Sequence, residues 1–256
     1  MRIAITGAAT GIGAEVAAQL KARGDEITAF DIVEPQSNID HWIKTDLSDT
    51  ASITGAINKA DGSFDALINN AGLPPREGLE EKILRVNYFG LRTFLNGMLN
   101  HLQPEASIVN TASRAGAMWR DNLTQVKALM TLDTADLPDF IADQKIDPTR
   151  AYNLSKEAVI VMTMAETENM IGRNLRMNSV SPAAVSTGIL TDFAKAFGDR
   201  MTRNVARAGR PGLPEEIARV IVFLASGDSN WIKGQDIVID GGMGSVIATE
   251  MLQLHN

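Results

Sequence analysis

Tyr152 and Lys156 are the residues of this sequence whose types and spacing best fit acid–base chemistry. They stand one helical turn apart, so on a helix their side chains share a face. A free phenol titrates near pH ~10, and a neighbouring ammonium group lowers its pKa because it favours the phenolate. We therefore expect Tyr152 to exchange a proton at neutral pH with the help of Lys156. By spacing alone, the pair is also typical of a solvated helix face.

A glycine-rich segment near the N-terminus has the spacing of a phosphate-binding turn. It reads Thr6-Gly7-Ala8-Ala9-Thr10-Gly11-Ile12-Gly13 and lies between a strand-like and a helix-like run. Gly7 permits a tight turn, Gly11 lets the backbone approach a pyrophosphate, and Gly13 allows close helix packing. We expect this turn, including Thr10 and Ile12, to hold the phosphates at a helix N-terminus. A plain connection between a strand and a helix is the alternative.

Asp31 stands where the second strand-like run ends. A carboxylate at this place accepts hydrogen bonds from the ribose hydroxyls of adenosine and repels the extra phosphate of NADP. The glycine-rich turn has no Arg or Lys to offset that repulsion. The sequence therefore predicts NAD(H) as the cofactor. The alternative is that Asp31 only starts a turn.

The elements that must position these residues alternate between strand and helix. Strand-like runs are expected at residues 2–6, 26–32, 42–46, 66–69, 107–111, 176–181 and 236–240. Helices are expected at 13–23, 50–59, 80–102, 151–171 and 214–225. This alternation predicts an α/β, Rossmann-type fold, with a doubly wound parallel sheet of seven strands and helices on both faces. No linker divides the chain, so we expect a single domain over residues 1–256, although the length would also permit two smaller ones.

Composition limits the class of partner. The net charge is -7 and the sequence pI is about 5.0, which disfavours nucleic acids and anionic membranes and favours a small-molecule substrate. The chain has no cysteine, and it shows neither a leader nor an apolar run that could span a membrane, so we expect a cytoplasmic protein. His41, His101 and His255 lack the spacing of metal ligands, so no metal is expected.

Five separated motifs resemble the short-chain dehydrogenase/reductase family. They are the glycine-rich turn, Asn69-Asn70-Ala71-Gly72, Asn87-Tyr88-Phe89-Gly90, Ile108-Val109-Asn110-Thr111-Ala112-Ser113 and Tyr152-Asn153-Leu154-Ser155-Lys156. The resemblance implies that Ser113 hydrogen-bonds the substrate oxygen and that Tyr152 carries the proton. It also implies that Lys156 binds the nicotinamide ribose and that Asn87 holds a water connecting Lys156 to solvent. Taken alone, Ser113 also fits a turn at the end of a strand.

The same resemblance implies further cofactor contacts. Asp46 and Leu47 would contact the adenine, and Asn70, Ala71 and Gly72 would stabilise the sheet beside the cofactor. Pro182, Val185 and Thr187 belong to the segment that holds the nicotinamide carboxamide. Ala183 stands where the family usually has glycine.

Two segments are expected on the substrate side. Residues 114–150 form a helical insertion resembling that of the bacterial 3α-hydroxysteroid dehydrogenase/carbonyl reductase branch, where it obstructs the common helix-bundle interface. We therefore expect a homodimer or other homo-oligomer that avoids that interface. Residues 188–210 form the expected lid. Candidate substrate contacts are Met118, Trp119, Ile189, Leu190 and Phe193, whose apolar side chains would equally fit a fixed core helix.

Together these features predict an NAD(H)-dependent oxidoreductase that interconverts a secondary alcohol and a ketone or other carbonyl. The substrate is expected to be hydrophobic, such as a hydroxysteroid or another cyclic or aromatic carbonyl. Two alternatives remain: a nucleotide-binding regulator without turnover on the same fold, and an epimerase or dehydratase of the same family.

Overall fold

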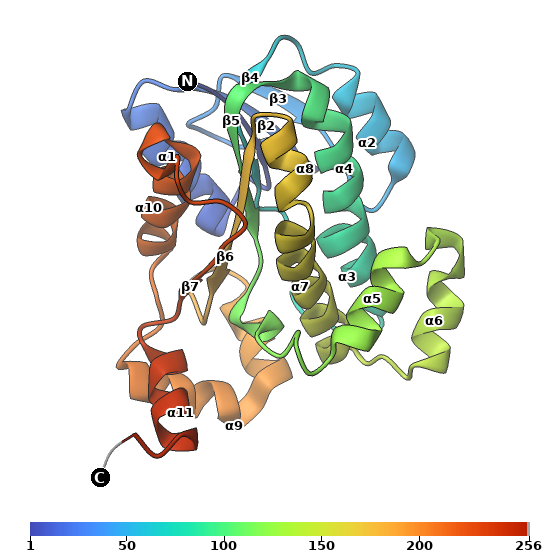
Figure 1. The fold of residues 1–256 in the computed structure, drawn as a ribbon, viewed down its shortest axis with the longest axis vertical. Coiled ribbons are helices and arrows are strands. Elements are labelled where there is room, and N and C mark those ends of the chain that lie inside the picture. The colour runs from blue at the N-terminus through green and yellow to red at the C-terminus, as the bar shows by residue number, and fades with distance from the viewer. Residues whose placement is uncertain (255–256) are drawn as a thin grey trace.

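The computed structural model describes residues 1–254, which contain one sheet of seven parallel strands (Figure 1). Its order is β3-β2-β1-β4-β5-β6-β7, so the strand order reverses between β1 and β4. The strands are β1 (Arg2–Thr6), β2 (Glu26–Asp31), β3 (His41–Lys44), β4 (Phe64–Asn69), β5 (Leu102–Thr111), β6 (Arg176–Pro182) and β7 (Asp236–Ile239). This topology confirms the predicted doubly wound sheet. Ligands of such sheets bind at the carboxyl ends of the strands, beside the reversal.

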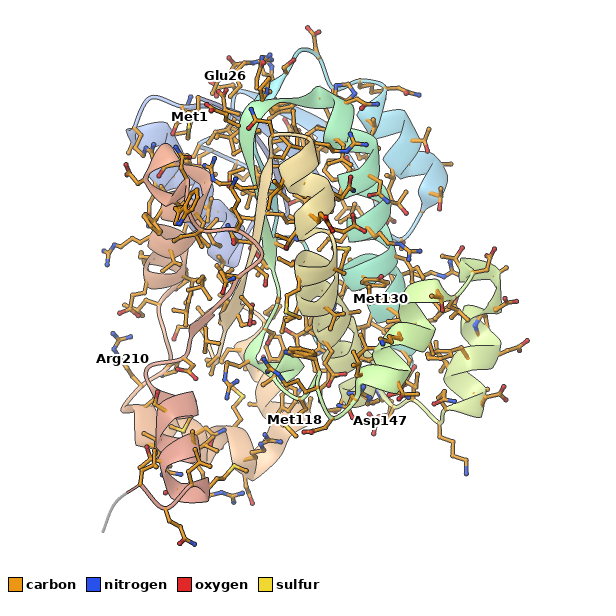
Figure 2. The ribbon with its side chains drawn as sticks, in the orientation of Figure 1. Met1, Glu26, Met118, Met130, Asp147 and Arg210 are labelled. Atoms are coloured by element: carbon orange, nitrogen blue, oxygen red, sulfur yellow. The ribbon has the colours of Figure 1, made fainter. Side chains whose placement is uncertain are left out.

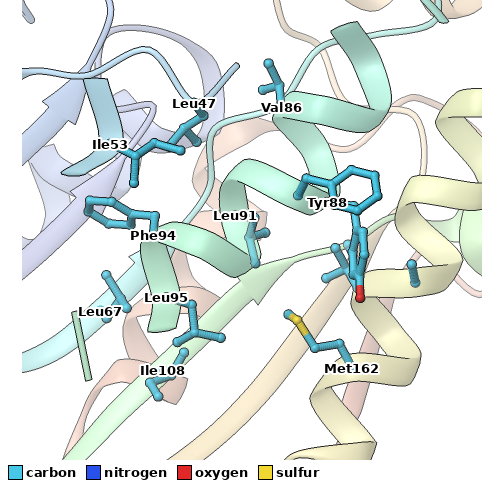
Figure 3. Close-up of a cluster of buried hydrophobic side chains, with 14 of the residues drawn as sticks. Leu47, Ile53, Leu67, Val86, Tyr88, Leu91, Phe94, Leu95, Ile108 and Met162 are labelled. Carbon is cyan, nitrogen blue, oxygen red and sulfur yellow. The ribbon is translucent and has the colours of Figure 1, made fainter. Parts of the chain in front are cut away.

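Helices cover both faces of the sheet (Figure 1). One face carries α1 (Gly11–Ala22) and α10 (Pro214–Ala225), which pack on each other. The other carries α2 (Thr50–Ile57), α4 (Leu91–Met98), α7 (Pro148–Ala165) and α8 (Thr167–Gly172). Each helical layer buries its own apolar cluster, and Figure 3 shows part of the second, where Phe94 and Leu95 of α4 approach strand residues Leu67 and Ile108.

The prediction of a single helix over residues 80–102 is wrong. The segment divides into α3 (Glu80–Leu84), a π-helical turn (Arg85–Gly90), α4 and a 3₁₀ turn (Leu99–His101). The π turn contains Asn87, whose side chain bonds a backbone outside the helix. At Gly90 a Cβ would lie 2.0 Å from the Leu47 carbonyl oxygen, so this turn also packs directly on another backbone. These tertiary constraints interrupt a pattern that looks continuously helical in the sequence.

Residues 114–150 fold into short helices beside α3, α4 and α7 (Figure 1). They form a 3₁₀ turn (Arg114–Gly116), α5 (Leu123–Thr131), a second 3₁₀ turn (Thr134–Asp136) and α6 (Leu137–Asp143). Helix α7, which carries Tyr152 and Lys156, begins at Pro148, earlier than expected. Asp147 caps it by accepting a hydrogen bond from the Arg150 N–H at 2.6 Å. It ends at Ala165, where α8 replaces the rest of the expected helix.

The last part of the chain lies at the carboxyl end of the sheet (Figure 1). It contains α9 (Leu190–Ala208) and α11 (Met243–Met251), a helix that the sequence did not lead us to expect. The 3₁₀ turn (Gly227–Ser229) follows α10 at the other end of the sheet, where Ser226 accepts from Arg176, the first residue of β6. Gly198 has φ 53° and ψ -140° and divides α9 into two halves. Among residues 1–254, no helix has the length and apolar character needed to cross a membrane.

Candidate active site

A cavity of about 1150 Å³ opens at the carboxyl ends of the strands, beside the reversal of strand order. Most of the predicted site residues line it: Gly7, Thr10, Gly11, Ile12, Asp31, Asp46, Leu47, Asn70, Ala71, Gly72, Ser113, Tyr152, Lys156, Pro182, Val185 and Thr187. Met118, Ile189 and Phe193 also line it. Gly13, Asn87, Trp119 and Leu190 do not line the cavity.

The glycine-rich turn requires glycine at three positions, because a side chain there would strain the backbone or collide with it. Gly7 and Gly11 have φ values of 70° and 59°, in the left-handed region that favours glycine. Gly13 lies behind the turn, where a Cβ would come within 1.9 Å of the Gly7 carbonyl oxygen. The helix α1 begins at Gly11, so its positive N-terminal end borders the cavity and suits a phosphate group.

Thr6 and Asn70 tie this turn to the end of β4. The Thr6 hydroxyl oxygen accepts hydrogen bonds from the N–H groups of Asn70 at 3.0 Å and Ala71 at 3.1 Å. The Asn70 side chain donates to the Gly7 carbonyl at 2.9 Å. The walls of the crevice at the reversal are therefore fixed by hydrogen bonds before any ligand enters.

Asp31 links the end of β2 to the same turn. Its Oδ2 accepts from the Ala9 N–H at 3.0 Å, and its Oδ1 accepts from the Val33 N–H at 3.1 Å. The carboxylate is thus held at the edge of the cavity, with its charge uncompensated by any Lys or Arg ion pair in the described chain. A second anionic group placed beside it would be repelled.

Tyr152 and Lys156 lie in the interior, one turn apart on α7. Burial raises the pKa of Tyr152 to about 12, and a hydrogen bond with Ser113 opposes this shift. Burial lowers the pKa of Lys156 to about 8. The Lys156 ammonium group donates to the Thr111 carbonyl at 2.8 Å and lies 5.9 Å from the phenol ring centroid. Burial and Ser113 are the causes of the Tyr152 shift in this structure, and the lowering of its pKa by Lys156 stays a prediction.

Asn87 is fully buried behind Lys156. Its Oδ1 accepts from the Leu73 N–H at 2.7 Å, and its Nδ2 donates to the Leu73 carbonyl at 3.0 Å and to the Ser155 hydroxyl at 3.3 Å. A Cβ at Gly72 would lie 3.3 Å from Asn87 Oδ1 and 3.4 Å from Lys156 Nζ. The missing side chain at Gly72 therefore lets these two polar groups approach each other.

Aromatic rings from α9 cover the phenol. The ring centroids of Tyr152 and Phe193 lie 5.2 Å apart and those of Tyr152 and Phe197 lie 6.5 Å apart, both edge to face. Phe193 and Phe197 stack at 6.3 Å. The predicted contacts Trp119 and Leu190 do not join them. The Trp119 ring instead lies 4.2 Å from the Arg120 guanidinium and packs against the buried apolar cluster on the α4 and α7 side of the sheet.

Two lining residues were missed because their helix was missed. Met243 and Ile247 of α11 complete the wall of the cavity. The sequence does indicate this helix, since Met243 and Ile247 follow a Gly-Gly pair and stand four residues apart, the spacing of one helical face. Among residues 1–254 no three His, Cys, Asp or Glu side chains gather as metal ligands, and His255 lies outside the described residues.

Comparison with known proteins gives consistent matches. The model described as "short chain dehydrogenase" matches residues 1–125, and that described as "Enoyl-(Acyl carrier protein) reductase" matches residues 139–244. Coniferyl-alcohol dehydrogenase of Pseudomonas sp. (strain HR199 / DSM 7063) is 33% identical and aligns over 95% of this chain and 96% of its own. The 3-alpha-hydroxysteroid dehydrogenase/carbonyl reductase of Comamonas testosteroni is 28% identical, over 96% and 97%.

A solved structure resembles the whole fold. The 3-alpha-hydroxysteroid dehydrogenase from Pseudomonas sp. B-0831, complexed with NADH, superposes with a TM-score of 0.85 at 29% identity. The match covers 98% of this chain and 99% of that chain.

Proposed function

The chain belongs to the short-chain dehydrogenase/reductase family of oxidoreductases, and on that premise we propose that it uses NAD(H) to interconvert an apolar alcohol and its carbonyl compound. The observation that carries the proposal is the meeting of Ser113, Tyr152 and Lys156 in the same cavity as the glycine-rich turn. These groups come from β5, α7 and the end of β1, so the fold alone brings them together.

The residues present fit a dinucleotide. The glycine turn offers a helix N-terminus to the pyrophosphate, and Gly7 and Gly11 keep side chains away from it. Asp31 would accept hydrogen bonds from the adenosine ribose and disfavour a phosphate there. Asp46 and Leu47, which line the same cavity, would contact the adenine. When bound, the nicotinamide would give hydride to the carbonyl carbon or take it from the alcohol. The NADH complex of the solved relative supports this choice.

The protein groups supply the proton. With its pKa raised to about 12, Tyr152 is protonated at neutral pH and can donate to the oxygen of a carbonyl substrate. The Ser113 hydroxyl, which precedes a 3₁₀ turn at the end of β5, would hold that oxygen. Lys156, whose pKa is about 8, is still largely charged at pH 7 and would stabilise the phenolate left on Tyr152.

An apolar, ring-bearing substrate fits the cavity wall beside Tyr152. Phe193 and Phe197 present aromatic rings, and Met118 and Ile189 add aliphatic surface. Figures 1 and 2 place Met118 at the same end of the molecule as α9. The relatives named for coniferyl alcohol and for a 3-alpha-hydroxysteroid support a ring-bearing alcohol as the substrate class.

The insertion supports a homodimer that does not use the α4 and α7 face. Arg92 of α4 donates to the Met130 carbonyl of α5 at 2.6 Å, and Asn122 donates to the buried Glu157 of α7 at 2.7 Å. Figure 2 shows Met130 beside α4. The insertion is therefore fastened to both helices and covers the face that a four-helix contact would need.

The test is a cofactor-coupled screen. Purified protein is mixed with NAD and a panel of primary and secondary alcohols, or with NADH and the matching aldehydes and ketones, and absorbance of the reduced nicotinamide is followed. We expect turnover with NAD(H) that favours ring-bearing substrates. Binding of NADH without turnover on any substrate would indicate a regulator instead. Product formation without net cofactor change would indicate an epimerase or dehydratase.

A further inference from the structure

An ion pair joins the residue after Ser113 to the residue after β7. Arg114 Nε lies 3.1 Å from Asp240 Oδ2. The Arg114 side chain is 28% exposed and that of Asp240 only 8%, so the pair is largely withdrawn from solvent. Both residues line the active-site cavity. None of the proposed chemical steps uses either of them.

Asp240 also holds the first turn of α11. Its Oδ1 accepts from the Gly242 N–H at 3.0 Å and its Oδ2 accepts from the Gly244 N–H at 2.7 Å. A Cβ at Gly244 would lie 2.9 Å from that carboxylate oxygen and 3.3 Å from Arg114 Nη2. The start of α11 therefore packs directly on the ion pair, without intervening side chains.

The charge of Arg114 also favours the ionised form of a β7 carboxylate, Asp236. Asp236 is held by the hydroxyl groups of Ser179 at 2.7 Å and Ser181 at 2.8 Å. Burial raises the pKa of Asp236, and the charge of Arg114 opposes that shift. Without Arg114, the poorly solvated Asp240 carboxylate would lose its ion-pair partner, and the connection from β7 to α11 would relax.

The position of α11 decides where the cavity ends. Met243 and Ile247 lie on one face of the helix and form cavity wall. At its other end α11 is joined to α9 by the ion pair of Glu250 with Arg207. Figure 1 shows the two helices side by side at the carboxyl end of the sheet. A small displacement at the start of α11 would therefore move part of the substrate wall.

We propose that Arg114 is a positioning residue that, through Asp240, fixes Met243 and Ile247 as the far wall of the cavity and so sets the upper size limit of the substrate. The proposal rests on the proposed function, because it is expressed in the turnover of alcohols. It assigns to Arg114 no contact with the reacting atoms. Substitution of Arg114 should therefore change which substrate lengths the enzyme accepts and leave kcat for small substrates unchanged.

The experiment measures kcat/KM with NAD for secondary alcohols from 2-butanol to 2-decanol. In the unaltered enzyme kcat/KM should rise by about fourfold per added methylene, the gain from burying it, and then fall once the chain meets the wall. In Arg114→Met we expect the fall to move to longer chains by about two methylenes, with kcat for 2-butanol changed less than about twofold. Arg114→Lys should retain the limit in part because the positive charge remains.

Two further variants make the result decisive. Ile247→Ala shortens the wall without touching the ion pair, and it should also move the limit to longer chains even if Arg114→Met folds poorly. Arg23→Met is the matched control, since Arg23 pairs with the similarly buried Asp25 far from the cavity, and it should leave the limit unchanged. An active Arg114→Met enzyme whose limit stays the same overturns the role of Arg114, even if Ile247→Ala moves the limit, and leaves the proposed function standing. Absence of turnover on every alcohol and ketone in the unaltered enzyme would refute the proposed function itself.

Discussion

The phenol ring of Tyr152 and the ring of Phe193 meet edge to face, with their centroids 5.2 Å apart. Phe193 lies in the first turn of α9, and on the other side of that turn Asp192 is paired with Arg76 at 2.8 Å. The segment expected to act as a lid therefore contacts the proposed proton carrier directly. Burial of the phenol, which raises its pKa, depends in part on where this helix lies.

Phe193→Leu should weaken substrate binding more than it weakens chemistry. An edge-to-face contact of Phe193 with a substrate ring would contribute about 0.5–1.5 kcal/mol beyond burial, so KM for ring-bearing substrates should rise about two- to tenfold when it is lost. Steady-state kinetics on benzyl alcohol and its cyclohexyl analogue would measure this. The Kd for NADH should stay the same, and an equal rise in KM for both alcohols would contradict the aromatic role.

Tyr152→Phe should abolish turnover and leave NADH binding largely intact. The variant keeps the ring that Phe193 contacts and removes only the hydroxyl, so the loss reports proton transfer, worth about 10²- to 10⁴-fold. Rates and NADH fluorescence titrations measure the two effects separately. Near-normal activity would reject Tyr152 as the acid and base.

Alcohol oxidation should speed up as pH rises. Oxidation needs the phenolate of Tyr152, and because its pKa is raised to about 12, the phenolate fraction grows by about tenfold per pH unit through the neutral range. Carbonyl reduction needs the phenol, which is present throughout that range, so reduction should not increase with pH. Profiles of kcat/KM in both directions test this.

A second measurement tests the cause of that pH dependence. Phe193→Leu exposes the phenol and should lower its pKa, moving the oxidation profile to lower pH. An oxidation rate that is flat between about pH 6 and about pH 9 in both proteins would show that Tyr152 does not set the profile.

Asp31→Asn should relax the preference for NAD over NADP. The amide loses the charge and keeps one acceptor oxygen, so it can accept from the Ala9 or the Val33 N–H but not from both. Because juxtaposed like charges cost several kcal/mol, the ratio of the two kcat/KM values should shrink by at least about tenfold. Asp31→Ala should relax it as well. Unchanged selectivity in both variants would refute the assigned role.

Small-angle scattering should show an assembly that does not use the α4 and α7 face. Arg92 and Asn122 fasten the insertion across that face, so a four-helix contact there would collide with α5. A charge-reversing Arg92→Glu variant should loosen the insertion and keep the oligomeric state. A tetramer built on the common four-helix contact would overturn the expectation.

Local sequence signals predicted much of the fold because strand and helix periodicities are short-range. Strand β1 and helix α10 have the predicted bounds, and the glycine turn has the left-handed φ values that its spacing suggested. Long-range contacts explain the failures. The helix containing Asn87 breaks because its side chain and Gly90 bond or pack on distant backbone, and α11 was overlooked although its apolar spacing was visible.

Residue types and order by themselves determined that Tyr152 and Lys156 share a helix face, that glycines form a turn before α1, and that the strands would be parallel. Only the tertiary structure decided the pKa values of Tyr152 and Lys156. Burial of both side chains, with Lys156 turned to the Thr111 carbonyl and Phe193 laid on the phenol, sets their pKa values in opposite directions. Such shifts depend on desolvation by residues distant in the chain, and local spacing carries no information about them.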